Sequence, residues 1–350
     1  MKDIILILQI ATIFIGSIVG AGVCSGRELN QFFAAYGIAG FLGLVLCGLL
    51  YIVFGKMIIY ITTHSRVKSY NEFVDLVCPR PIAKFINVIL TIFLLSSTSI
   101  ILAGSGSIIN QYFGLPKWVG FIIMIICSSV FLLRKTEGLF EVNGIVVPTL
   151  IIVMSVLFFT YISHYPSHIT YSHMLLIPRQ KSNLALSTIV YVSFNILTII
   201  GVIVPLASEI QKPRELTKGI VLGSAALTVI SMFIMFLMLV NPFYPKLYEM
   251  PLLAVATQLN QFLQTCILGV MWLEMFSSQV SNVYSLSHFM KNKFHIQYYL
   301  AIFLVVAVAA PFSVIGFTEL VEFLYPLYGV LSLVFLIYCI IFYIKGKKAC

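Results

Sequence analysis

Apolar residues fill long runs along the whole chain, and polar residues are concentrated in the short segments between these runs. A helix crosses the hydrocarbon core of a bilayer with roughly 20 apolar residues, which is the length of the runs. The pattern predicts ten membrane spans, at about 4–24, 38–62, 83–110, 117–134, 139–162, 184–210, 217–241, 263–288, 298–316 and 321–344. We therefore expect an all-α integral membrane protein whose residues 1–350 form one transmembrane domain.

The composition fits a membrane protein and argues against other classes. Hydrophobic residues make up 60% of the chain and charged residues 9%, with a mean hydropathy of +1.05, which is far outside the range of soluble domains. The seven cysteines are scattered without a C-x-x-C pair, so no disulfide or zinc framework is expected. The catalytic motifs H-E-x-x-H and G-x-S-x-G do not occur in the sequence, and we expect neither an enzyme nor an organic cofactor.

Lysine and arginine are distributed unevenly over the predicted loops. With the N-terminus inside, fifteen of them lie on the cytoplasmic side, one lies within a span, and five lie on the outer side, namely Arg27, Lys117, Arg179, Lys181 and Lys246. The positive-inside rule then predicts that both termini are cytoplasmic. The net charge of +9 thus reflects topology, with anionic lipid rather than nucleic acid as the expected partner of the basic side chains.

The spans divide into two sets of five around a polar loop at 163–183. An odd number of spans in each half reverses the orientation of the second half, so a repeat formed by 1–162 and 184–350 must be inverted. Each half places a short amphipathic segment between its second and third spans, at 69–77 and at 250–259. Each half also opens with a span that is weak in its middle, and inverted repeats with interrupted first helices are typical of secondary transporters. We therefore expect the first and the sixth spans to be discontinuous helices.

The first span contains four glycines in the segment FIGSIVGAGVCSGRE, which covers residues 14–28. Each glycine costs roughly 1 kcal/mol relative to alanine inside a helix, and opened backbone is tolerated in a membrane only where protein or a watery cavity covers it. One interpretation is helix packing, because the glycines have G-x-x-x-G spacing. The other is an unwound hinge at Gly20, Ala21 and Gly22, whose backbone groups are offered to a carboxylate or a small cation.

Polar side chains interrupt the third and the sixth spans. Asn195 offers more hydrogen-bonding groups than lipid can satisfy, so we predict that Ser193 and Asn195 orient polar groups of a ligand while Phe194 covers its apolar part. The alternative is a hydrogen bond between helices beside a core phenylalanine. The four hydroxyl residues at 96–99 cover every face of the third span, and at least one, with Thr98 as the candidate, is expected to line the same cavity.

The eighth span carries a carboxylate near its middle, at Glu274. A charged group at that depth is costly and points to function, so Glu274 is a candidate proton carrier. The alternative is a hydrogen-bonded glutamate that faces a polar neighbouring helix. Ser277 and Ser278 follow closely, and serines at membrane depth either take part in binding or hydrogen-bond to their own helix.

Taken as a set, these motifs resemble a known family. The stretches IGSIVGAGVCSGRELNQFF (15–33), SFNILTIIG (193–201) and FSSQVSN (276–282) are similar to spans one, six and eight of LeuT-fold transporters of the amino acid–polyamine–organocation superfamily. More closely, the chain resembles the YkvI-like bacterial membrane proteins. The resemblance covers essentially the whole chain and implies a LeuT-like fold with a 5+5 inverted repeat in a bacterial plasma membrane.

The resemblance also implies a cation site. In the family, two hydroxyl residues of the eighth span join backbone carbonyls of the first span around a sodium ion. Oxygen ligands of this kind suit a hard cation. By position, the hydroxyls are those of Ser277 and Ser278, and the carbonyls are those of Gly16, Val19 and Glu274.

A further implication of the resemblance is an outer gate. The family closes its outer side with a salt bridge, which by position joins Arg27 to Glu319 or to Glu322. The match is imperfect, because the family arginine falls one residue earlier, at Gly26. The alternative is an exposed interfacial ion pair that contributes about 0–1 kcal/mol.

The sequence thus leads to a specific expectation of function. We expect a symporter, driven by Na⁺ or H⁺, that moves a small amino acid or a related amine by alternating access around a site at the membrane midplane. The fifth span lacks the lysine that proton-coupled members of the family use, which favours sodium. The alternative is a transporter-like receptor that binds a small molecule without moving it, as some spore germination proteins of the superfamily do.

Overall fold

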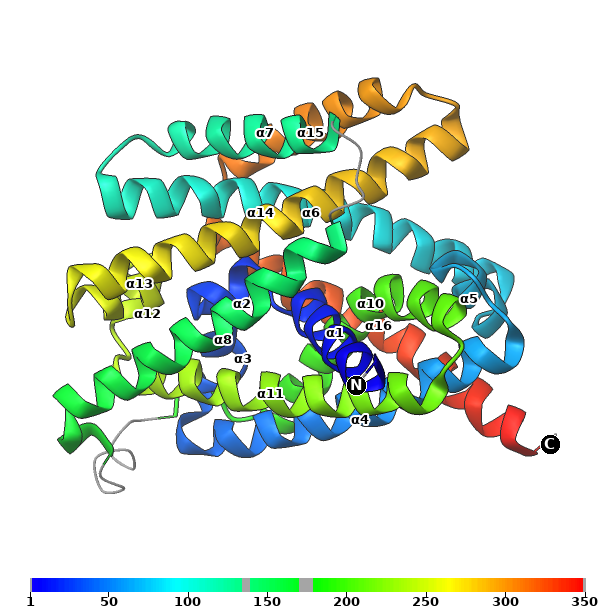
Figure 1. Cartoon of the computed structure of the whole chain (residues 1–350), viewed down its shortest axis with the longest axis horizontal. Helices are drawn as coiled ribbons and strands as arrows, with labels where there is room; N and C mark the ends of the chain where they lie inside the picture. The colour runs from blue at the N-terminus through cyan, green and yellow to red at the C-terminus, as the bar shows by residue number, and fades with distance from the viewer. Residues whose placement is uncertain (1, 134–138, 170–178, 349–350) are drawn as a thin grey trace.

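All regular secondary structure of the described residues is helical. The computed structural model describes residues 2–133, 139–169 and 179–348, so part of the predicted central loop lies outside the described residues. Most of the long helices run along the longest axis of the molecule (Figure 1). The outer end is defined here by α12 (Tyr244–Leu247) and α13 (Pro251–Thr257), and the inner end by α5 (Tyr70–Val77) and the C-terminus (Figure 1).

Predicted spans two to ten each fall on one helix, with bounds that differ by only a few residues. These helices are α4 (Gly40–Ser65), α6 (Arg80–Phe113), α7 (Lys117–Leu133), α8 (Leu139–His164), α10 (Leu184–Ile210), α11 (Pro213–Val240), α14 (Gln261–Phe294), α15 (Tyr298–Ser313) and α16 (Phe317–Lys348). Within the described part of the chain, six helical segments are long and apolar enough to cross a membrane, and three more apolar helices are shorter. The chain is therefore an all-helical membrane protein, and the number of helices that cross the membrane stays a prediction.

The first span is broken twice. Helix α1 (Lys2–Ile18) ends before Gly20, whose extended backbone (φ −135°, ψ −167°) precedes α2 (Ala21–Ser25). Helix α2 in turn ends at Gly26, and α3 (Arg27–Phe32) begins directly after it. Gly26 has φ +82°, and a Cβ there would lie 2.8 Å from Sδ of Met238, so this corner requires glycine on two counts.

The predicted break in the sixth span is wrong, because α10 is one continuous helix from Leu184 to Ile210. Its polar side chains are satisfied without opening the backbone. The Ser193 hydroxyl donates to the carbonyl of Ile189 at 2.8 Å, and the Asn195 amide donates to the carbonyl of Tyr191 at 3.1 Å. Because such bonds form within an intact helix, a polar cluster alone does not require an unwound segment.

The long helices pack in two groups. In the first, α1 packs against α11, and α4 packs against both α10 and α11. In the second, α6, α7, α14 and α15 contact one another, while α8 and α16 contact both groups. The two predicted amphipathic segments form α5, against α6 and α10, and α13, against α14 and α11. This division places the break of the first span between the two groups.

Candidate functional site

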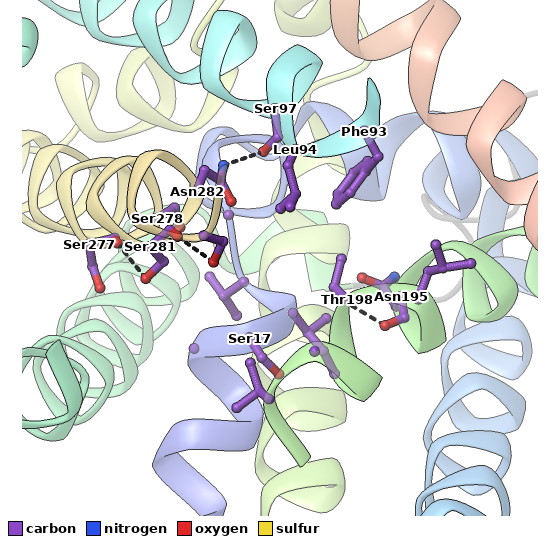
Figure 2. Close-up of a pocket in the computed structure, with 18 of the residues that line it drawn as sticks. Ser17, Phe93, Leu94, Ser97, Asn195, Thr198, Ser277, Ser278, Ser281 and Asn282 are labelled. Atoms are coloured by element: carbon purple, nitrogen blue, oxygen red, sulfur yellow. Dashed lines mark hydrogen bonds between the residues drawn. The ribbon is translucent and has the colours of Figure 1, made fainter. Parts of the chain in front are cut away.

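A cavity of about 430 Å³ lies beside the break between α1 and α2. Its walls are formed by the end of α1, by the break itself, and by α6, α10 and α14 (Figure 2). Gly20 and Ala21 line it directly, so the unwound backbone of the first span faces open space rather than a neighbouring helix. This covered opening is the setting in which membrane proteins tolerate irregular backbone.

The wall formed by α14 is polar. Ser277, Ser278, Ser281 and Asn282 all line the cavity from this helix. Asn282 donates from Nδ2 to Oγ of Ser97 on α6 at 2.9 Å, and these two side chains point toward each other in Figure 2. The Ser281 hydroxyl donates to the carbonyl of Ser277 at 3.0 Å. Hydroxyl and amide groups thus follow one face of α14 along the cavity.

The wall formed by α10 lies across the cavity from α14 and is mixed (Figure 2). Phe194, Asn195 and Thr198 line it, and the Thr198 hydroxyl donates to the carbonyl of Asn195 at 2.7 Å. Phe194 stacks on Tyr325 of α16 with a centroid distance of 4.7 Å, and it meets the edge of Phe93 of α6 at 5.5 Å. A ligand in the cavity therefore faces hydroxyls on one side and aromatic rings on the other.

The cavity extends from the break toward the inner end. Its lining includes Tyr70 of α5, Glu209 near the end of α10, and Ser285 of α14, which all lie on that side. Glu209 and Ser285 are exposed. The cavity is therefore open at the inner end.

Between the cavity and the outer end, Arg27 of α3 contacts three partners. Nη1 of Arg27 contacts Oε1 of Glu322 on α16 at 2.9 Å. Nη2 donates to the carbonyl of Tyr248 at 2.5 Å, and Nε donates to the carbonyl of Glu249 at 3.3 Å. Of the two acidic partners expected for Arg27, the structure pairs it with Glu322, while the carboxylate of Glu319 lies against Gly316.

A second set of polar contacts fixes the same outer segment to α6 and α7. The Glu249 carboxylate accepts from Nζ of Lys117 at 2.6 Å and from the hydroxyl of Ser107. Gln111 exchanges two hydrogen bonds with the backbone of Met250, at 3.0 and 3.1 Å. Sequence reasoning missed this cluster, because its members lie on segments far apart in the chain and form no motif.

Glu28 of α3 lines the cavity, a position that the sequence did not predict. It is 2% exposed, and within the described ranges its Oε1 atom has no hydrogen-bond partner. Successive residues of a helix point about 100° apart, so Arg27 faces the outer contacts while Glu28 faces inward. Gly22 makes room for it, because a Cβ at Gly22 would collide with the Glu28 carboxylate and with the Tyr325 ring.

Comparison with known proteins finds relatives that match nearly the whole chain. No protein-family model matches it. It is 28% identical to the membrane protein YkvI of Bacillus subtilis over 336 residues, which are 94% of this chain and 93% of YkvI. It is also 26% identical to YyaD of the same organism over 331 residues, with 95% of each chain covered. The chain is homologous to the YkvI and YyaD membrane proteins.

Solved structures that resemble this chain include LeuT-fold transporters. MhsT in complex with L-phenylalanine matches with a TM-score of 0.68 at 14% identity, over 94% of this chain and 88% of MhsT. A manganese transporter of Eremococcus coleocola matches with 0.65 at 13% identity, over 97% and 78%. A Na⁺-coupled sialic acid symporter matches with 0.64 at 13% identity, over 90% and 74%. At these identities the likeness establishes the fold alone.

Four of the seven ligand residues predicted from the sequence line the cavity, namely Gly20, Ala21, Phe194 and Asn195. The other three, Gly22, Ser193 and Thr98, do not belong to the lining. The Thr98 hydroxyl donates to the carbonyl of Leu94 at 2.9 Å, as Ser193 does to Ile189, so both are turned toward their own helices. Ser97, the neighbour of Thr98, lines the cavity instead.

The predicted cation residues are divided between the two sides of the cavity. Gly16 and Val19 line it from the first span, and Ser277 and Ser278 line it from α14. Glu274 lies outside the lining and is 1% exposed, and neither of its carboxylate oxygens has a hydrogen-bond partner in the described part of the chain. Within the described residues, no three His, Cys, Asp or Glu side chains cluster as metal ligands, so a cation here would depend on hydroxyl and carbonyl oxygens.

Proposed function

We propose that the protein is a secondary active transporter, a cation-coupled symporter for a small amino acid or a related amine. Its ten helices would form a 5+5 inverted repeat, from 1–162 and 184–350, in a bacterial cell membrane with both termini in the cytoplasm. The observation that carries the proposal is the cavity at the break of the first span, open at the inner end and closed at the outer end by Arg27. This is one of the two states that alternating access requires.

The proposed mechanism depends on which helices the contacts of Arg27 join. Arg27 belongs to the first span, whereas its partners belong to α16 and to the segment before α13. Release of these contacts, together with closure of the inner end, would turn the cavity toward the outside. Because α1 and α14 belong to different packing groups, such a motion changes the separation between them.

The proposed cation site couples to that motion. Gly16 and Val19 lie on one side of the cavity, and Ser277 and Ser278 lie on the other. A cation bound by oxygen atoms from both sides would hold α1 against α14 and would favour the state in which the inner end is closed. Proton carriage by Glu274 is the alternative coupling, supported by a buried carboxylate that lacks hydrogen-bond partners.

Counterflow in proteoliposomes tests the function. Vesicles loaded with a mixture of amino acids and small amines are diluted into trace amounts of each labelled compound, and protein-free vesicles serve as the control. Accumulation of one label that depends on unlabelled internal substrate supports transport. Binding of a compound without any exchange would instead identify a receptor and would refute the proposal.

A further inference from the structure

Glu28 carries a feature that the proposed function does not explain. Its side chain is buried beside the cavity, and its Oε1 atom has no hydrogen-bond partner among the described residues. Tyr191 is the neighbouring side chain that hydrogen-bonds to its carboxylate. A buried ionised carboxylate with one free oxygen is costly unless it takes up a proton or a positive group compensates it.

Among the residues that the structure describes, no ion pair includes Glu28. The adjacent Arg27 has Glu322, Glu249 and Glu319 as its electrostatic partners, and Glu28 is not among them. Two acidic residues, Glu28 and Glu209, line the cavity, whereas no Lys, Arg or His among the described residues does so. The cavity therefore favours positive ligands over negative ones.

Aromatic rings continue the wall beside this carboxylate. The Tyr325 ring and the Glu28 carboxylate both lie against Gly22. Tyr325 stacks on Phe194 at 4.7 Å, and Phe194 meets Phe93 at 5.5 Å. All three rings line the cavity, and aromatic faces attract cations that have lost part of their water.

We propose that Glu28 is the counter-ion for a cationic group of the transported ligand, an organic ammonium held between this carboxylate and the rings of Phe93, Phe194 and Tyr325. The inference rests on the proposed function, because it takes the cavity as the substrate site. It narrows the substrate class from amino acids and amines to compounds with a net positive charge. A ligand of this kind leaves the Ser277 and Ser278 side of the cavity free for a separate coupling ion.

Ligand-induced thermal stabilisation of the purified protein tests the proposal. The probes share one phenyl group and differ in charge: 2-phenylethylamine is a cation at pH 7, L-phenylalanine a zwitterion, 3-phenylpropionate an anion and 2-phenylethanol neutral. Tetramethylammonium serves as a second cation without a ring. A cationic probe is expected to raise the melting temperature of the wild type most, because ligands that bind the native state stabilise it.

Glu28→Gln keeps the size of the side chain and removes the charge, and it is expected to weaken binding of the cationic probe roughly 30-fold or more. Asp75→Asn is the matched control, because this carboxylate of α5 is exposed, lies outside the cavity lining and is screened by solvent, and it is expected to change affinity by no more than about twofold. Glu28→Asp, which keeps the charge, is expected to retain measurable binding. An unliganded Glu28→Gln protein that melts no lower than the wild type establishes that it folds.

Several outcomes would overturn the proposal. These are equal stabilisation by charged and neutral probes, no stabilisation by either cation at millimolar concentration, or unchanged cation binding in Glu28→Gln. A Glu28→Gln protein in which only the pH dependence of uptake changes would make this residue a proton carrier and would also overturn it. Cation binding without counterflow would uphold Glu28 as the counter-ion and refute transport, whereas counterflow of an anion or a neutral compound would do the reverse.

Discussion

Arg27 and Glu322 form an ion pair of 2.9 Å whose two side chains differ sharply in exposure, at 4% for the arginine and 53% for the glutamate. An exposed carboxylate contributes little to such a pair, because solvent screens its charge. The two backbone carbonyls that Arg27 also contacts, those of Tyr248 and Glu249, are independent of Glu322. In the proposed transporter, closure of the outer end would therefore depend on the arginine more than on Glu322.

This asymmetry predicts unequal effects of two substitutions. Arg27→Gln removes contacts to three partners and is expected to raise outer access to the cavity about tenfold or more, whereas Glu322→Gln should raise it no more than about fivefold. Access is measured as the rate at which a membrane-impermeant thiol reagent, added from the outer side, modifies Ala21→Cys in a background without reactive native cysteines. Arg179→Gln, at an exposed position, is the control. Equal rates in the two gate variants would contradict the prediction.

A second prediction concerns the proposed cation site, whose residues lie on the first span and on α14. Ser277→Ala combined with Ser278→Ala is expected to abolish the sodium dependence of uptake, because it removes the hydroxyl ligands that α14 would supply. Ser281→Ala is the matched control, since this hydroxyl donates to its own helix. Uptake is measured in proteoliposomes with and without a sodium gradient. A sodium dependence that survives in the double variant would refute the assignment.

Substitution of Glu274 tests whether the coupling ion is a proton or sodium. The carboxylate oxygens of Glu274 lack hydrogen-bond partners among the described residues, so no hydrogen bond there explains a buried acid. If it carries the coupled proton, Glu274→Gln should flatten the pH profile of uptake and leave the dependence on sodium unchanged. A pH profile identical to that of the wild type would rule out proton carriage by this residue.

The glycines of the first span predict opposite outcomes for two alanine substitutions. Gly22→Ala would place a Cβ against the Glu28 carboxylate and within 2.8 Å of Cε2 of Tyr325, so ligand affinity should fall about tenfold or more. Gly20→Ala should be tolerated, because no atom lies within 4 Å of its Cβ position and its φ of −135° suits any residue. The measurement is equilibrium binding of the ligand to the purified variants. Gly22→Leu, with its larger side chain, is expected to lower the affinity further. Normal affinity in both Gly22 variants would mean that the glycines serve helix packing alone.

Much of the fold was predictable because a bilayer fixes the length of each apolar run. The break of the first span was also predictable from its glycines. The continuity of α10 was not predictable. Ser193 and Asn195 suggested an interrupted helix, but both side chains donate hydrogen bonds to carbonyls of the preceding turn. Sequence gives residue type at a position, but it does not tell which acceptor a hydroxyl will find.

The candidate site was predictable only where it follows the backbone of the first span and α14. The direction of Glu28 depends on the corner at Gly26, whose left-handed backbone resets the helical phase between α2 and α3. The contacts of Glu249 with Lys117 and Ser107 depend on how α6, α7 and the segment before α13 meet in space. Neither relationship leaves a periodic signal in the sequence.

Arg27 and Glu28 are consecutive residues of a six-residue helix, one bound to the outer contacts and the other directed into the cavity. Both side chains are carried by the same turn of helix, so a rotation of α3 about the corner at Gly26 would displace the two together. In the proposed transporter, a ligand that draws the Glu28 carboxylate inward by moving α3 would also shift the guanidinium relative to Glu322, Tyr248 and Glu249. Binding in the cavity and opening of the outer end would then be coupled mechanically through a single peptide bond.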